Sequence, residues 1–216
     1  MLYVCASAHG TTVMATLNSE DRIIGGRQSG GDPLGYYPDS QLTVGVAGGD
    51  PNRVNTNTVI GFTLPTLNPG ESLSAATFSI TVGGSSGSNF TVALFGLTTE
   101  NPDDSGTDFF SQSGVGVDGV STLISSTFTS TAASPGSIPS SDVSTFLQSF
   151  YVGNVPVQSE VFFRLNQTTA LAINNTRRMT FTKDTATLTV TSIPEPGAAL
   201  LGGLGTLILL RRRRNI

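Results

Sequence analysis

The sequence has very few of the residues that build common active sites. It contains one Cys (Cys5), one His (His9) and no Trp. From residue 10 onward there is neither a thiol nor an imidazole. This excludes an intrachain disulfide framework, Ser-His-Asp or Cys-His catalysis, and Cys/His zinc sites from the main part of the chain. We therefore expect a protein that is not an enzyme.

Charge is also scarce and unevenly placed. Charged residues make up 12% of the chain, and the net charge is −4. Four of the eleven basic residues are consecutive at the C-terminus, so residues 16–196 hold seven basic residues against all fifteen acids. An acidic domain repels the phosphate backbone of nucleic acids. We expect no nucleic-acid partner.

The composition favours strands over helices. There are 25 Gly, and the charged residues that cover the wet faces of most helices are rare. Alternating or short apolar segments bounded by turn residues predict eight strands, at 12–17, 41–46, 57–63, 73–82, 89–97, 121–129, 161–166 and 185–191. The Gly- and Ser-rich segment 83–87 predicts a turn. We expect one all-β domain, a single antiparallel β-sandwich of jelly-roll type.

One segment, residues 140–151, has a helical pattern. Its apolar residues recur at helical spacing as Val143, Phe146, Leu147 and Phe150. Ser140 or Ser141 could cap the N-terminus of such a helix. We expect one short helix here.

The C-terminal segment 193–216 has three consecutive parts. It begins with Pro194, Glu195 and Pro196, continues with fourteen apolar or small residues at 197–210, and closes with Arg211, Arg212, Arg213 and Arg214. A fourteen-residue helix is about 21 Å long, less than the hydrocarbon core of about 30 Å. Four arginines would need partners in a protein core, whereas at a membrane their side chains reach the headgroups. We expect a hydrophobic C-terminal helix that associates with a membrane.

The order of these three parts resembles the PEP-CTERM sorting signal. The resemblance implies recognition by an exosortase, a membrane-embedded enzyme like a cysteine protease or transpeptidase, in bacteria that secrete exopolysaccharide. It makes Pro194, Glu195 and Pro196 the sorting motif. It also implies an exported protein, membrane-associated through its C-terminus before processing and then located at the cell surface or outside the cell. The resemblance covers only residues 193–216 and does not concern the activity of the domain.

The N-terminus carries part of an export pattern. Met1–Cys5 is a short apolar stretch, and Ala6, Ser7 and Ala8 have the small-x-small form of a signal-peptidase site. We interpret residues 1–15 as a signal-peptide remnant, with a strand from about Thr11 as the alternative. The expected organisation is this remnant, a sandwich over 16–192, and the sorting signal over 193–216.

Residues 20–97 resemble the DNRLRE-type, carbohydrate-binding-module-like β-sandwiches of surface proteins. The resemblance lies in Glu20-Asp21, Leu42–Gly45, Val59–Pro65 and Leu73–Phe78. The sequence departs from that pattern by lacking Trp and by having Thr58 or Val59 where an Arg is expected. The resemblance implies a sandwich fold and keeps a sugar-binding module as an alternative function.

Two groups of side chains are candidate ligand sites. Asp103, Asp104 and Asp108 place three carboxylates in one loop, which is the oxygen chemistry that Ca²⁺ prefers, without the EF-hand spacing. The alternative for this loop is a solvated turn. A structural Ca²⁺ is the one cofactor that the sequence suggests. Tyr36 and Tyr37 offer either a platform for a sugar ring or an edge-packing turn.

A row of threonines is a further candidate surface. Thr185, Thr187, Thr189 and Thr191 alternate with apolar residues, so in a strand they share one face. Such rows occur on ice-binding surfaces, but a solvent-facing strand is the simpler explanation.

The sequence thus predicts a non-enzymatic surface or matrix protein with an exosortase-like partner and a membrane-associated C-terminus, and with extracellular polysaccharide as a further candidate partner. A carbohydrate-binding module, and an ice-binding or hydrolytic surface protein, are the open alternatives.

Overall fold

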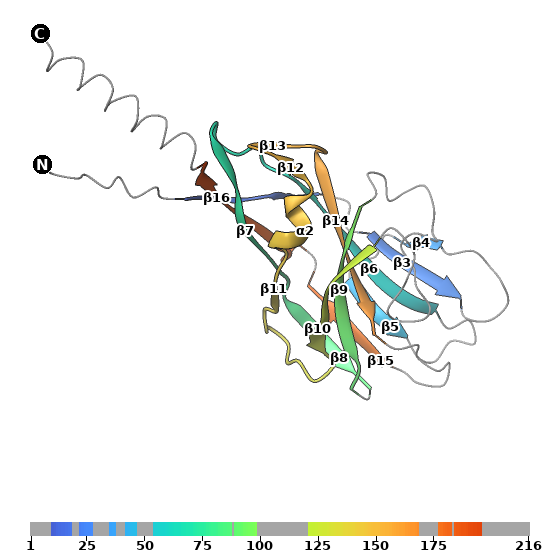
Figure 1. Cartoon of the computed structure of the whole chain (residues 1–216). Coiled ribbons are helices and arrows are strands. Elements are labelled where there is room, and N and C mark those ends of the chain that lie inside the picture. The colour runs from blue at the N-terminus through green and yellow to red at the C-terminus, as the bar shows by residue number, and fades with distance from the viewer. Residues whose placement is uncertain are drawn as a thin grey trace, which may run out of the picture.

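The computed structural model describes residues 10–18, 22–27, 35–37, 42–46, 54–87, 89–98, 121–168, 177–182 and 184–195. For residues 22–27, 35–37, 46 and 54–55 the description is limited to the backbone. Within these ranges the chain forms antiparallel sheets and one short helix (Figure 1). The predicted all-β class is confirmed. The jelly-roll subclass stays a prediction.

The smaller sheet has four strands. Their spatial order is β1 (Thr11–Met14), β16 (Thr187–Pro194), β7 (Glu71–Ser79) and β11 (Ser140–Asp142). In β16 the residues alternate regularly, with Leu188 and Val190 buried and the threonines between them partly exposed. This sheet therefore has one face on the core and one face toward solvent.

The larger sheet carries most of the remaining strands. Its main path is β10 (Ser121–Ser130), β9 (Thr91–Leu97), β14 (Glu160–Gln167), β6 (Val54–Thr63), β5 (Leu42–Val46), β15 (Arg177–Phe181) and β8 (Val82–Ser86). Off this path, β2 (Thr16–Leu17) and β3 (Arg22–Arg27) pair with β6, and β4 (Gly35–Tyr37) pairs with β3. A separate hairpin consists of β12 (Tyr151–Val152) and β13 (Val155–Pro156).

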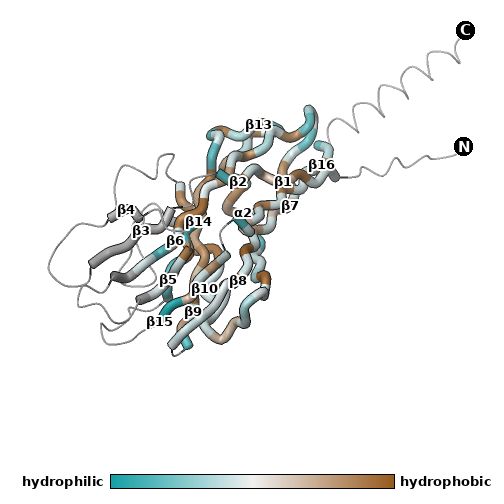
Figure 2. The backbone as a smooth tube through the Cα atoms, turned by 180° about the vertical axis from the view of Figure 1, so that it is seen from behind, coloured by the Kyte–Doolittle hydropathy of each residue, from teal (hydrophilic) through white to brown (hydrophobic). Residues whose placement is uncertain are grey.

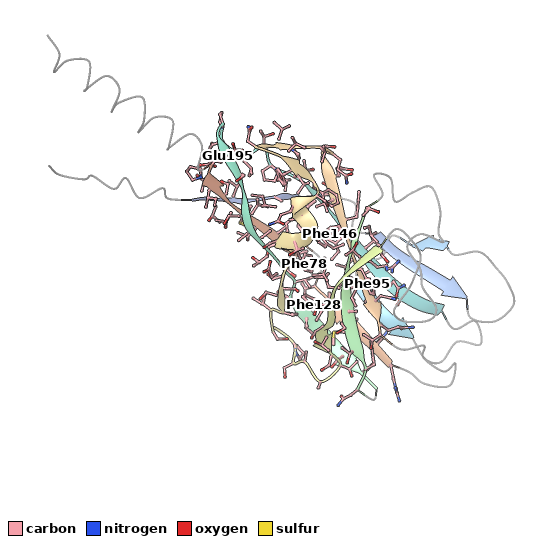
Figure 3. The ribbon with its side chains drawn as sticks, viewed as in Figure 1. Phe78, Phe95, Phe128, Phe146 and Glu195 are labelled. Atoms are coloured by element: carbon pink, nitrogen blue, oxygen red, sulfur yellow. The ribbon has the colours of Figure 1, made fainter. Side chains whose placement is uncertain are left out.

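The core lies where the two sheets face each other. Phe78 of the smaller sheet is fully buried and meets Phe62, Phe163 and Phe128 of the larger sheet, with ring centroids 6.1, 5.2 and 5.7 Å away. Figure 2 shows hydrophobic residues along the strands around this interior, and Figure 3 shows Phe78, Phe128 and Phe146 inside it. A sandwich-like arrangement follows.

The predicted helix is shorter than expected. Helix α2 spans Ser144–Gln148, and Ser140–Asp142 form β11 instead, paired with β7. Neither predicted serine is the cap, because both lie in β11 and the N-cap residue is Val143, without a side-chain cap hydrogen bond. The Asp142 carboxylate accepts hydrogen bonds from the backbone N–H and the hydroxyl of Ser144. The four predicted apolar residues are all buried. The ring of Phe146 occupies the space beside Gly96, where a Cβ would lie 2.4 Å from it.

The predicted strand 73–82 is two strands in different sheets. β7 ends at Ser79, and β8 begins at Val82 in the larger sheet. At the crossing, the backbone N–H groups of Ile80 and Val82 donate to Pro139 and Ser137 instead of to a neighbouring strand. The predicted turn 83–87 is therefore wrong over most of its length, because β8 runs to Ser86. Strands β3, β4, β12, β13 and β15 were not among the predicted strands.

The first described strand begins before the boundary expected at residue 16. β1 pairs with β16 over its whole length, and Ala15 lies in the core. Residues 11–14 and 16–17 form strands, as in the strand alternative. Residues 1–9 lie outside the described residues.

Candidate functional site

The first residue of the predicted sorting motif, Pro194, belongs to strand β16, and the second, Glu195, extends the pairing of that strand. Strand β16 continues through Pro194, which pairs with Glu71 of β7. The N–H of Glu195 then donates to the carbonyl oxygen of Gly70 at 2.8 Å. The expected boundary between residues 192 and 193 therefore falls inside a strand, and the folded domain extends to Glu195.

A proline is tolerated here because of the backbone geometry. Successive N–H groups of a strand point to opposite sides, and the N–H of Glu195 points toward β7. The nitrogen of Pro194 thus faces the β1 side, where β1 pairs only as far as Ser192. At an unpaired edge the missing N–H costs no ladder hydrogen bond.

The Glu71 carboxylate connects three segments at this end of the domain. It accepts hydrogen bonds from Thr11 Oγ1 at 3.1 Å, from Asn68 Nδ2 at 3.2 Å and from the hydroxyl of buried Ser192. The hydrogen bond from Ser192 is the main cause that lowers the pKa of Glu71, and those from Asn68 and Thr11 lower it further. The start of β1, the start of β7 and the end of β16 are thereby held together by the ionised carboxylate.

The β12–β13 hairpin lies beside the end of β16. Figure 1 shows the hairpin at the same end of the domain, and Figure 3 shows Glu195 there. A carboxylate oxygen of Glu195 lies 3.7 Å from the position that a Cβ on Gly153 would occupy. Gly153 has φ +60° in the two-residue turn, a conformation that favours glycine.

The hairpin is tied to the domain by three hydrogen bonds. The N–H of Leu67 donates to the carbonyl of Asn154 at 2.9 Å, and Asn154 Nδ2 donates back to the carbonyl of Leu67. The Tyr151 hydroxyl donates to the carbonyl of Pro65 at 2.9 Å, and burial raises the pKa of this phenol to about 12. Its proton is therefore retained at neutral pH, and the hairpin has a fixed position.

Most of the other predicted site residues lie outside the described residues. This holds for Pro196, the apolar segment 197–210, Arg211–Arg214, and Asp103, Asp104 and Asp108. Tyr36 and Tyr37 are described as backbone in β4, opposite Ile24 and Ile23 of β3. Among the described residues, no group of three His, Cys, Asp or Glu could hold a metal ion. No helix in the described ranges has both the length and the apolar character to cross a membrane.

Three of the four predicted row threonines share a face as expected. Thr187, Thr189 and Thr191 alternate with buried residues on β16, whereas Thr185 precedes the strand and donates to the carbonyl of Thr182. The Thr191 hydroxyl lies 3.3 Å from the hydroxyl of Thr12, and that of Thr187 lies 2.9 Å from the hydroxyl of Ser79. These hydroxyls link neighbouring strands on the outer face.

A set of buried polar residues in the larger sheet was not predicted. Arg164 is fully buried in β14, with its guanidinium 5.0 Å from the Phe95 ring centroid and 3.2 Å from Ser121 Oγ. Asn57 and Gln167 are each 1% exposed, and within the described part of the chain their side-chain amide groups have no hydrogen-bond partner. A signal was present, because Arg164 and Asn166 alternate with apolar residues in a segment predicted as a strand.

Comparison with known proteins adds no relative. No protein-family model matches the chain, and no curated protein matches it.

Proposed function

We propose that this chain is an exported, non-enzymatic protein of the cell surface or extracellular matrix, and that its C-terminal segment is a sorting signal recognised by an exosortase. One observation carries the proposal. Strand β16 leads without a linker into Pro194-Glu195-Pro196, which is followed by the apolar segment 197–210 and by Arg211–Arg214. Each part has a physical role in membrane sorting.

The apolar segment partitions into lipid, and the arginines hold the far end on the cytoplasmic side. The domain is thereby retained on the outer side, with the motif close to the membrane surface. A membrane-embedded enzyme meets its substrate at that depth. The fourteen apolar residues are few for a lasting anchor, which favours a segment that is read and then removed.

The non-enzymatic role is supported by the amino-acid inventory. The one Cys and the one His both precede residue 10, so the domain has no imidazole or thiol for proton transfer or nucleophilic attack. An open groove among the described residues, between β10 and α2, is lined by one carboxylate, Asp142. That carboxylate is engaged by Ser144, which lowers its pKa. A pair of carboxylates for glycoside hydrolysis is not found in this groove.

Replacement of Pro194, Glu195 and Pro196 with alanine tests the sorting role. In a bacterium with the sorting enzyme, the unprocessed precursor should accumulate in the membrane fraction, because the motif is lost while the apolar segment and arginines remain. Immunoblots of membrane and surface fractions measure this. A matched control replaces Pro135 and Pro139 in the loop before β11 and should be processed normally. Normal processing of the triple variant would refute the proposal.

A further inference from the structure

Exposed apolar side chains gather on the β12–β13 hairpin. Val152, Val155 and Val157 are 71%, 51% and 63% exposed, and Ile193 at the end of β16 is 42% exposed. Single exposed apolar residues are common on soluble proteins, but a group on one projecting hairpin is not. Residues 151–159 also contain no charged residue. We refer to Val152, Val155 and Val157 as the valine patch, in which Val152 and Val155 are register partners.

The valine patch has a fixed position in the domain. The backbone at Asn154 and the Tyr151 hydroxyl are hydrogen-bonded to the segment Pro65–Leu67, and the N–H of Val157 donates to the carbonyl of Phe150 at 2.8 Å. The hairpin therefore presents its valines outward without a change of backbone conformation. A surface ordered in this way loses little conformational entropy when it is covered.

The patch lies beside the point where the chain leaves the domain. Glu195 is hydrogen-bonded to Gly70 and has its carboxylate next to Gly153 in the hairpin turn. One residue, Pro196, separates Glu195 from the first residue of the apolar segment 197–210. Two residue steps span at most about 7 Å. If the apolar segment enters a bilayer, this end of the domain is therefore held at the lipid surface.

We propose that the valine patch is a membrane-contact surface, which enters the interfacial region of the bilayer that holds the C-terminal segment. The inference rests on the proposed membrane association of that segment. The contact also adds apolar area to a segment of fourteen residues, which as a helix would be about 21 Å long and so shorter than the hydrocarbon core.

The charged residues near the valine patch indicate which type of lipid it contacts. The described acids at this end include Glu71, Glu160 and Glu195. The basic side chains that the structure describes, Arg164, Arg177 and Arg178, belong to β14 and β15. Attraction to anionic headgroups therefore does not drive the contact. The surface fits zwitterionic lipid, with burial of apolar area as the driving force.

The absence of Trp from the chain provides the test. In Val155→Trp the introduced indole is the sole one, and Ile138→Trp is the matched control, because Ile138 is 65% exposed in the loop before β11, at the opposite end of β7. The full-length variants are incorporated into phosphatidylcholine vesicles with and without brominated acyl chains. The indole emission of the Val155→Trp variant should shift to shorter wavelength and fall about twofold with brominated lipid, whereas that of the Ile138→Trp variant should not change.

Vesicle flotation distinguishes failure of the membrane-contact proposal from failure of the proposed membrane association of the C-terminal segment. A chain that floats with the vesicles while the indole of the Val155→Trp variant stays unquenched overturns the membrane-contact surface and leaves the sorting proposal intact. A chain that does not float overturns both. Val152→Trp, at the adjacent exposed position, repeats the measurement if Val155→Trp fails to fold as judged by circular dichroism.

Discussion

A disulfide between Ser72→Cys and Ile193→Cys, made with Cys5→Ser, should stop processing of the C-terminal segment, and reduction with dithiothreitol should restore it. The two residues are register partners in β7 and β16. Register partners in antiparallel strands have Cα atoms about 4.5–5.5 Å apart, within the range that a disulfide spans. The motif Pro194-Glu195-Pro196 is unchanged in this variant.

The expected effect follows from the position of the motif in the sheet. Pro194 is paired with Glu71, and the N–H of Glu195 is bonded to Gly70, so a protease can bind the motif as an extended strand only after the end of β16 separates from β7. Strand ends open at low free-energy cost, whereas a disulfide of about 2–4 kcal/mol would reduce the open population roughly 30-fold or more.

The matched control places the disulfide elsewhere between the same strands. Thr77 and Thr189 are also register partners of β7 and β16, away from the motif. A Thr77→Cys, Thr189→Cys variant, also with Cys5→Ser, should be processed at the normal rate by membranes that contain the sorting enzyme. If the disulfide between positions 72 and 193 leaves the rate unchanged, then the end of β16 does not have to open for processing.

Phe78→Ala should lower the free energy of unfolding by about 3–5 kcal/mol. The ring of Phe78 is fully buried and is the contact point of β7 with three phenylalanines of the larger sheet. Its removal leaves a cavity between the sheets and loses three ring contacts. A domain of this size has a total stability of about 5–15 kcal/mol, so the loss is a large fraction of it.

Urea denaturation of the full chain in mild detergent, followed by circular dichroism, measures this loss. Phe78→Leu is the conservative control and should cost less than half as much, because it retains most of the buried volume. A loss below about 1 kcal/mol for Phe78→Ala would mean that the sheets do not depend on this contact.

The strand pattern could be predicted from local sequence, but the sheet to which each strand belongs could not. The alternation from Ala76 to Val82 is continuous, so nothing in it marks the change of sheet after Ser79. Likewise, Ser140–Asp142 have no strand propensity. They pair with β7 because its edge has unused hydrogen-bonding groups, a tertiary effect that outweighs the local helical pattern.

The sequence alone proposes the candidate sorting segment, but the structural context of its first residues could not be predicted. Pro-Glu-Pro, the apolar segment and the Arg run are consecutive in the sequence and need no fold to be recognised. Pro194 of β16 pairs with Glu71 of β7, which is more than a hundred residues away in the sequence. The local sequence therefore does not reveal this pairing. The proximity of the valine patch to Glu195 depends in the same way on contacts with Pro65 and Leu67.

Mass spectrometry of the C-terminal peptide of the protein recovered from the cell surface tests the central proposal most directly. If the tail is a sorting signal, the mature chain should end at or shortly after Glu195-Pro196 and should lack the peptide 197–216. Surface protein that still carries Arg211–Arg214 would contradict the proposal.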